Sequence, residues 1–273
     1  MSLVFAAAAN HAPGITARRE LAGKAQQQAF FDAYAELARR LAAARPEALV
    51  VVTAEHFTNF FMNNMPAFCI GLAERYKGPV EDEKFLKIAK TSVPGAPALA
   101  RALAAELQKD IDLAHSEELL LDHGTMIPLH LLAPRMALPV IPIIQNCLSA
   151  PRPTLSRCYR LGEALGAAIA ARPERIAVLA AGGLSHWPAA PRSGEVNEAW
   201  DRAFLDAFLA GDRAALTRYT EAEIERDAGP GGHEIRAWVT LAGATQGLAR
   251  ETLCFTPIPA YAVCGAIVSV TAA

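Results

Sequence analysis

Short apolar runs alternate with longer helical stretches along this 273-residue chain. Such alternation is typical of an α/β layer fold and argues against a helical bundle or a β-sandwich. The sequence therefore predicts an α/β protein with a central mixed β-sheet flanked by helices. The expected strands are Leu3–Ala9, Ala48–Ala54, Ala67–Gly71, Val140–Gln145, Ile176–Ala181, Thr252–Ile258 and Ala262–Val270. The expected helices, rich in Ala, Leu, Arg and Gln, are Ala25–Ala44, Pro97–Gln108, Thr154–Ala171, Glu195–Ala210 and His233–Ala249.

The sequence contains no internal repeat, no low-complexity tract and no Gly/Ser-rich linker. We therefore expect one domain over residues 1–273. The least regular long stretch is Gly78–Gly95, which contains the charged run EDEKFLK and two prolines. We expect it to be either a mobile surface loop or a cover over a functional site.

Charge and cysteine content exclude several classes of function. A net charge of −2, a pI near 6.4 and scattered basic residues predict binding to neither nucleic acid nor anionic membranes. The five cysteines show no ligand-like spacing, which favours buried thiols in a reducing, cytoplasmic setting. No apolar run approaches the roughly 20 residues that span a bilayer, and the opening SLVFAAAA lacks the basic start of a signal peptide.

Five of the seven histidines lie in short runs that favour an exposed imidazole: NHAPG (His11), EHFTNFF (His56), LDHGTMIPL (His123), GGLSHWP (His186) and GGHEIRAW (His233). All of them except His56 lie beside or near Gly or Pro. Loops that leave secondary-structure elements are rich in these residues. The concentration of histidines suggests a metal site.

His11 and His56 each follow an expected strand, and ligand sites of open α/β sheets gather beyond the carboxyl ends of strands. Glu234 follows the Gly-rich AGPGGH at the start of a helical pattern. Together they would form a two-histidine, one-carboxylate set with open coordination positions. Such a set suits Fe(II), and it also suits catalytic zinc. Taken alone, either histidine is as readily a hydrogen-bonded loop residue.

Two further histidines are candidates for proton transfer, since imidazole titrates near neutral pH. His186 follows an expected buried strand and two glycines. His123 has a carboxylate neighbour, Asp122, and a glycine after it. It is an acid or base, a supporting residue outside the metal site, or a turn histidine.

The neighbours of these residues have less specific interpretations. Glu55 either orients an imidazole from outside the metal site or forms a salt bridge. His233 points away from the metal if Glu234 points towards it, and we expect a cap or surface residue. Phe57 and Phe60 are suitable walls for an aromatic substrate and equally suitable core residues.

Taken in order, NHAPG, EHFTNFFMNNMPAFCIG, LDHGTMIPL, GGLSHWP and the pair VNEAWDRAFLD and AGPGGHEIRAWV resemble the class III extradiol ring-cleavage dioxygenases. This family includes the protocatechuate 4,5-dioxygenase catalytic subunit and 2,3-dihydroxyphenylpropionate 1,2-dioxygenase. The resemblance runs from Val4 to Gly265. No single motif is decisive, but their order and spacing together are specific.

The resemblance implies Fe(II) held by His11, His56 and Glu234, with a catecholic substrate and O2 bound beside it. It implies His186 as the base that takes a proton from a substrate hydroxyl, and His123 as the acid that assists O–O cleavage. The expected product is a ring-opened semialdehyde. It also implies a homo-oligomer.

Two departures from the family pattern bear on the site. The residue before the second ligand is usually Asp and is here Glu55, and Asp122 is expected to support an imidazole. PIPAYAVCG lacks the Ser-Asn pair of the protocatechuate enzyme, and Tyr261 there resembles the phenylpropionate type. The small helical subunit that closes the protocatechuate site is not in this chain, so a lid must be a separate accessory subunit or the Gly78–Gly95 stretch.

Two other functions remain compatible with these residues. A zinc-dependent hydrolase would use the same three ligands with His186 as its base. A Memo-like protein of the same fold would use the cleft for binding or signalling, without catalysis. The presence of both His123 and His186 around the ligand set argues against the binding protein.

Overall fold

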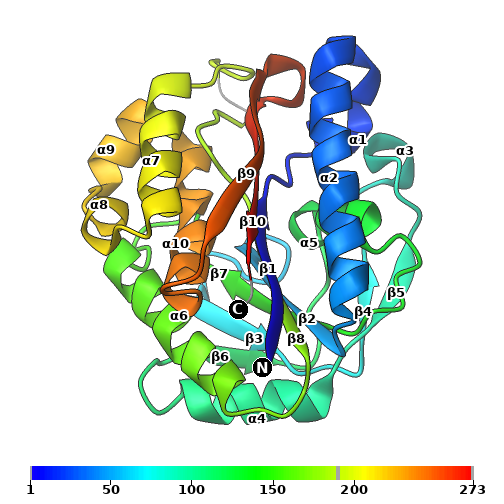
Figure 1. The fold of residues 1–273 in the computed structure, drawn as a ribbon, viewed down its shortest axis with the longest axis vertical. Coiled ribbons are helices and arrows are strands. Elements are labelled where there is room, and N and C mark those ends of the chain that lie inside the picture. Colours follow the sequence, from blue (N-terminus) through cyan, green and yellow to red (C-terminus); the bar gives the residue numbers. More distant parts are fainter. Residues whose placement is uncertain (1, 189–190, 272–273) are drawn as a thin grey trace.

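The computed structural model describes residues 2–188 and 191–271. An eight-stranded mixed sheet runs through it in the order β6-β3-β7-β2-β8-β1-β10-β9, and β4 and β5 form a separate two-stranded sheet (Figure 1). The strands are β1 (Leu3–Ala9), β2 (Ala48–Ala54), β3 (Phe68–Gly71), β4 (Arg75–Gly78), β5 (Thr91–Pro94), β6 (Ala114–Ser116), β7 (Val140–Gln145), β8 (Ile176–Ala181), β9 (Arg250–Ile258) and β10 (Val263–Val270).

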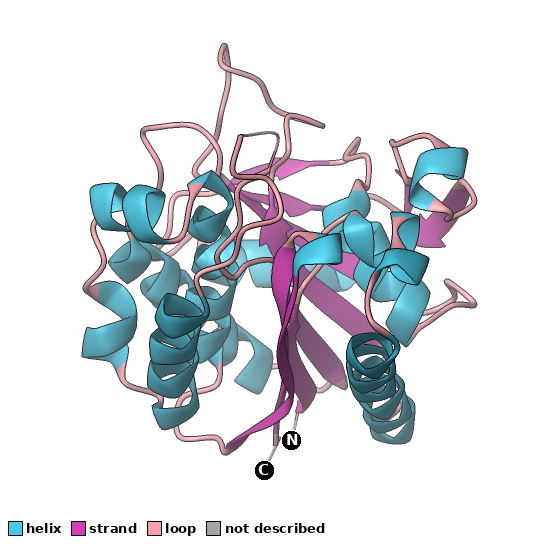
Figure 2. Cartoon of the chain, turned by 90° about the horizontal axis from the view of Figure 1, so that it is seen from above, coloured by secondary structure: helices cyan, strands magenta, loops and turns pink. Residues whose placement is uncertain are grey.

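Helices cover both faces of the large sheet (Figure 2). The α-helices are α1 (Gly14–Ala17), α2 (Lys24–Ala44), α3 (Glu83–Leu86), α4 (Pro97–Leu107), α5 (His123–Leu132), α6 (Leu155–Ala170), α7 (Glu198–Ala210), α8 (Arg213–Thr217), α9 (Glu221–Asp227) and α10 (Ile235–Ala244). Three short 3-10 helices are η1 (Arg19–Leu21), η2 (Pro230–Glu234) and η3 (Pro259–Tyr261). The prediction of an α/β fold with a central mixed sheet is confirmed. Within the described part of the chain, no helix has the length and apolar character needed to cross a membrane.

The four central strands, β7, β2, β8 and β1, run parallel. Alternate residues of a strand point to opposite faces, and in β2 Val50 and Val52 join one hydrophobic core while Leu49 and Val51 join the other. The first core contains residues of α4, α6, α7 and α10, and the second contains residues of α2 and α5. Burial on both faces explains why these strands are apolar throughout.

The register of the parallel strands brings their carboxyl ends to one edge of the sheet. Ala9 of β1 pairs with Ala181 of β8, and Ala54 of β2 pairs with Gln145 of β7. The segments that follow these strands therefore emerge side by side, and they contain His11, His56 and His186.

Helix α5 was not predicted from the sequence. Its residues include Gly124 and Pro128, which are poor helix formers, and a turn histidine was one of the three interpretations of His123. Asp122 caps the helix, because its Oδ1 accepts a hydrogen bond from the backbone N–H of Gly124 at 2.9 Å. His123 is thus the first residue of a helix rather than a turn histidine.

The expectation for Gly78–Gly95 was incomplete. This stretch contains helix α3 and strand β5, which pairs with β4 in an antiparallel hairpin. Asp82 caps α3 through hydrogen bonds from the backbone N–H groups of Lys84 and Phe85. Because this stretch is rich in charged residues, its short helix was not recognised from the sequence.

Candidate active site

Five side chains from five segments converge beyond the carboxyl edge of the sheet. His11 follows β1, His56 follows β2, and His186 lies in the segment after β8. His123 begins α5, and Glu234 ends η2 immediately before α10. All five residues line one cavity, so the structure brings together every predicted ligand and proton-transfer residue.

Glu234 lies at the centre of this group. Its Oε2 is 3.1 Å from His11 Nε2, and its Oε1 is 3.4 Å from the Nε2 atoms of both His56 and His186. The backbone N–H of Gly183 donates to Oε2 at 2.8 Å, which fixes the carboxylate. One carboxylate is thus shared among three imidazoles that all present the same ring nitrogen.

A second set of potential metal ligands overlaps the first. One ring nitrogen from each of His11, His56 and His123 lies within 4.8 Å of the others. The ring centroids of His56 and His123 are 4.2 Å apart. These three histidines could hold a metal, so the donor groups available are three imidazoles and the Glu234 carboxylate.

Hydrogen bonds at Nδ1 orient three of the imidazoles. His56 donates to Asp122 Oδ2 at 2.9 Å, His123 donates to Glu81 Oε1 at 2.6 Å, and His186 donates to the Leu184 carbonyl at 3.0 Å. Each bond leaves Nε2 as the free nitrogen. Asp122 thus supports an imidazole, as expected, and that imidazole is His56.

Electrostatics distinguish the histidines. Burial lowers the pKa of His11. Burial also lowers the pKa of His56, but the Asp122 and Glu234 carboxylates outweigh it and raise that pKa well above its usual value. For His186, burial is likewise outweighed by Glu234, and the pKa is raised. Burial alone would raise the pKa of Glu234, but His11 and His186 outweigh it and hold that pKa well below its usual range, so the carboxylate is ionised and ready to bind a cation.

The donor set fits a metal ion. His11 Nε2 is buried and has no hydrogen-bond partner among the described residues, although the ionised Glu234 carboxylate lies beside it. A buried polar atom without a partner costs free energy, and a metal ion bound by both groups would remove that cost. Imidazole nitrogens with a carboxylate oxygen suit Fe(II) or zinc.

Buried polar contacts of His233 fix the segment that carries Glu234. His233 is fully buried, so the expectation of a surface or capping residue was wrong. Arg236 Nη1 donates to His233 Nδ1 at 2.9 Å, and His233 Nε2 donates to Glu225 Oε2 at 3.0 Å. Burial and the Arg236 charge lower the pKa of His233 to about 3. This neutral imidazole ties η2 to α9, and it points away from the cavity, as predicted.

Glu55 has neither of its expected roles. Its Oε1 accepts hydrogen bonds from the backbone N–H groups of Thr58, Asn59 and Phe60. Among the described residues it contacts no imidazole and forms no ion pair. Glu55 instead shapes the loop that follows His56.

The cavity has a volume of about 420 Å³ and is mostly apolar. Tyr261 lines it, but Phe57 and Phe60 are not among the described residues of its wall. Phe57 is exposed and stacks on Phe61, with ring centroids 6.4 Å apart, and Phe60 packs at the edge of the α2–α5 core. The apolar walls include Phe85 and Leu148 instead.

The Gly78–Gly95 stretch covers the cavity. Glu81 contacts His123, and Phe85 of α3 lines the wall. Lys87, the residue after α3, forms an ion pair at 3.1 Å with Glu20 of η1. Of the two roles expected for this stretch, the structure favours the cover.

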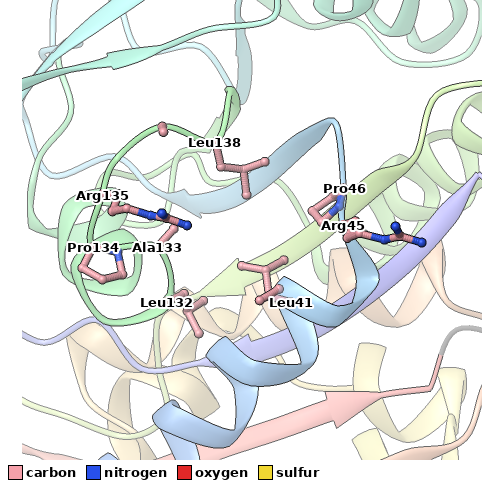
Figure 3. A pocket seen from close by; sticks show the side chains of 10 residues that line it. Leu41, Arg45, Pro46, Leu132, Ala133, Pro134, Arg135 and Leu138 are labelled. Atoms are coloured by element: carbon pink, nitrogen blue, oxygen red, sulfur yellow. The ribbon is translucent and has the colours of Figure 1, made fainter.

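A separate hollow lies between the C-terminal end of α2 and the segment after α5 (Figure 3). Its wall is formed by apolar residues such as Leu41 and Leu138, together with Arg45 and Arg135. It contains no metal-ligating side chain, so the chemistry belongs to the histidine cavity.

Sequence reasoning missed Asn10 and Glu81. Asn10 is fully buried, donates to the Gly183 carbonyl, and accepts from the Ala266 N–H at 2.5 Å. It thus links the segment that carries His11 to the segment that carries His186. Its position next to His11, a candidate ligand, could have identified Asn10 from the sequence. Glu81 lies in a run of charges, and nothing in the sequence sets it apart.

Comparisons with known proteins agree with this geometry. The family model described as the catalytic LigB subunit of aromatic ring-opening dioxygenase matches residues 5–264. A protein of Cupriavidus necator named 2,3-dihydroxyphenylpropionate/2,3-dihydroxicinnamic acid 1,2-dioxygenase is 34% identical over 260 residues, covering 77% of this chain and 82% of its own. A protein of the same name from Paraburkholderia xenovorans is 31% identical over 282 residues, covering 83% and 87%.

The fold also matches a crystal structure of an uncharacterized protein from Escherichia coli K12, with a TM-score of 0.61 and 19% identity. That match covers 88% of this chain and 91% of the other, and it supports the fold alone. The family match spans nearly the whole chain and includes all five residues that meet in the cavity. The chain therefore belongs to the LigB family of aromatic ring-opening dioxygenases, as the sequence motifs predicted.

Proposed function

We propose that this protein is an Fe(II)-dependent extradiol dioxygenase that opens the ring of a catechol with O2 and forms a semialdehyde. The observation that carries the proposal is the contact of one ionised carboxylate, Glu234, with His11, His56 and His186 at the base of an apolar cavity. His11, His56 and Glu234 are the proposed metal ligands. When bound, Fe(II) would supply a site where catechol and O2 meet and exchange electrons.

His186 is the proposed base. Its Nδ1–H is bound to the Leu184 carbonyl, so the lone pair of Nε2 faces the cavity. Its raised pKa suits it to accept a proton from a catechol hydroxyl near neutral pH. Glu234 would then stabilise the imidazolium that forms.

His123 is the proposed acid. Its Nδ1–H is held by Glu81, and its Nε2 is free to carry a proton towards the oxygen that leaves during O–O cleavage. Its ring lies beside that of His56, whereas His186 contacts Glu234. The two proton carriers would thus serve different atoms of the bound reactants.

The rest of the chain is proposed to serve this one reaction. We infer that residues 1–273 act as a single catalytic domain in the cytoplasm, and that the protein is a homo-oligomer. Because α3 already covers the cavity, we infer that a separate small accessory subunit is not required for closure. Size-exclusion chromatography with light scattering tests the oligomeric state.

Reconstitution tests the function. The purified protein is loaded with Fe(II) without oxygen and then mixed with a panel of catechols in air. We expect oxygen uptake and a yellow ring-opened product. His186→Gln should keep its iron and lose turnover, whereas the control His130→Gln, on the same helix as His123 but outside the cavity wall, should keep both. Bound iron with no product from any catechol would refute the proposal.

A further inference from the structure

The cavity wall combines three kinds of chemistry. It holds the histidines and Glu234, and it includes residues of α1 and the exposed Arg18 that follows this helix. Apolar residues such as Phe85, Leu148 and Tyr261 also line it. Apart from the histidines, Arg18 is the one cationic residue among the described residues of this wall. A ligand that fills the cavity from the metal centre outwards therefore meets a positive charge.

The charge of Arg18 is not neutralised by the protein. Within the described part of the chain, its side chain forms no ion pair and no hydrogen bond. The nearby charged residues are already engaged: the Arg19 guanidinium lies 3.7 Å from the centre of the Phe31 ring, and Glu20 pairs with Lys87. Arg18 is thus available to an anionic group of a ligand.

The backbone holds Arg18 at this position. Its N–H donates to the Gly14 carbonyl at 3.0 Å and closes the α1 turn. A Cβ at Gly14 would lie 2.6 Å from Cα of Tyr261, so only glycine lets α1 pack this closely on η3. The Tyr261 hydroxyl donates to the Arg19 carbonyl at 3.1 Å. The backbone on both sides of Arg18 is therefore held against Tyr261, a residue of the cavity wall.

We propose that Arg18 determines substrate specificity by binding a carboxylate on the side chain of the catechol. This inference rests on the proposed function. Arginine binds carboxylates through two parallel hydrogen bonds, and the carboxylate would lie at the cavity opening while the two ring hydroxyls reach the metal centre. The apolar residues of the cavity wall would accommodate the ring and a short aliphatic linker.

The test compares an anionic substrate with a neutral substrate of the same shape. The substrates are a catechol with a propionate side chain and the corresponding propionamide, and the variants are Arg18→Gln and Arg19→Gln. Arg18→Gln should raise KM for the propionate about tenfold, because a charge-assisted hydrogen bond at a half-open site is lost. It should leave kcat for the propionate and both constants for the amide nearly unchanged.

Arg19→Gln is the matched control, since it removes the neighbouring charge from outside the cavity wall. It should change neither substrate's KM. Arg18→Lys should recover part of the loss, because lysine keeps the charge but not the paired hydrogen bonds. A second readout is inhibition by phenylpropionate, which lacks both hydroxyls and should bind the wild-type protein better than Arg18→Gln.

The outcomes separate this inference from the proposed function. If the wild-type protein opens both catechols and Arg18→Gln has the same KM and kcat for each, the Arg18 inference is wrong. The dioxygenase assignment then stands. An equal loss for propionate and amide would also overturn it, since the effect would then not depend on the carboxylate. If the wild-type protein opens no catechol, the proposed function itself fails.

Discussion

His56 donates a hydrogen bond from Nδ1 to Oδ2 of Asp122 at 2.9 Å, while Oδ1 of the same carboxylate caps helix α5. One side chain therefore orients a proposed ligand and begins the helix that carries His123. Carboxylates in this position set the tautomer of a ligating histidine and increase its basicity.

Asp122→Asn separates the two roles, because asparagine is as good a helix cap as aspartate. We expect iron affinity to fall about 10- to 100-fold, while helix α5 stays capped. Competition with a coloured chelator measures the affinity. Asp212→Asn, at the cap of the remote helix α8, is the control and should bind iron as wild type does. Unchanged affinity in Asp122→Asn would show that the hydrogen bond does not tune the ligand.

His123 distinguishes the two overlapping ligand sets. If His11, His56 and Glu234 hold the metal, His123→Asn should keep its iron and lose most of its turnover, since removing a general acid costs about 100- to 10,000-fold in rate. Iron content and oxygen uptake are measured on the same sample. Loss of iron in this variant, with iron retained in Glu234→Gln, would instead identify the three histidines as the ligands.

Gly231 controls the position of His186. A Cβ at residue 231 would lie 2.2 Å from His186 Nε2, so Gly231→Ala must displace the imidazole. We expect turnover to fall at least about tenfold, because displacement of a catalytic group by about 1 Å can cost 100-fold in rate. The melting temperature should change little, since a side chain rather than the backbone moves. Crystallography of the variant would test the displacement directly. Turnover equal to that of the wild-type protein would contradict the prediction.

The buried carboxyl of Asp201 should make the stability of the folded protein depend on pH. It is fully buried, its Oδ1 accepts from the Ser185 N–H at 2.7 Å, and its Oδ2 accepts from the Ser185 hydroxyl at 2.9 Å. Burial raises its pKa from 3.8 to about 7, although the Ser185 hydrogen bonds oppose the shift. In the pH range between these two values the folded state binds a proton that the unfolded state has lost. This group's contribution to stability is therefore complete below about pH 4 and is lost as the pH rises to about 7.

Asp201→Asn removes this dependence and keeps a side chain of the same shape. Relative to wild type, the variant should gain stability as the pH rises, by a few kcal/mol at most between about pH 4 and about pH 8. Urea unfolding of both proteins across this range measures the difference. A constant difference at all pH values would show that Asp201 is ionised in the folded protein throughout.

The strands of the large sheet could be predicted because burial on both faces requires continuous apolar runs, such as ALVVVTA in β2. Helix α5 could not, because its stability comes from the Asp122 cap and from packing of residues such as Met126 and Ile127, which outweigh the poor propensities of Gly124 and Pro128. The β4–β5 hairpin was missed because its short strands contain few buried apolar residues: Tyr76, Gly78 and Val93 are its buried paired residues.

For the site, position after a strand and the family motifs identified all five residues that meet. The supporting contacts were harder to predict, because Glu81 and Asn10 act through partners far away in sequence. Phe57 and Phe60 show that aromatic character alone does not identify the residues of a cavity wall. They have the chemistry of an aromatic wall, but Phe57 is exposed and Phe60 packs at the edge of the α2–α5 core, and Phe85 lines the cavity instead.

Strand β1 lies between β8 and β10, and Asn10 at its end is hydrogen-bonded to Ala266 of β10. No proposed ligand belongs to β10, yet the segment that carries His11 is completed only by this last strand. During synthesis on the ribosome, a nascent chain would therefore lack a finished iron site until β10 had emerged. Iron loading should accordingly follow folding rather than guide it, and removal of β10 should abolish iron binding although all three proposed ligands remain.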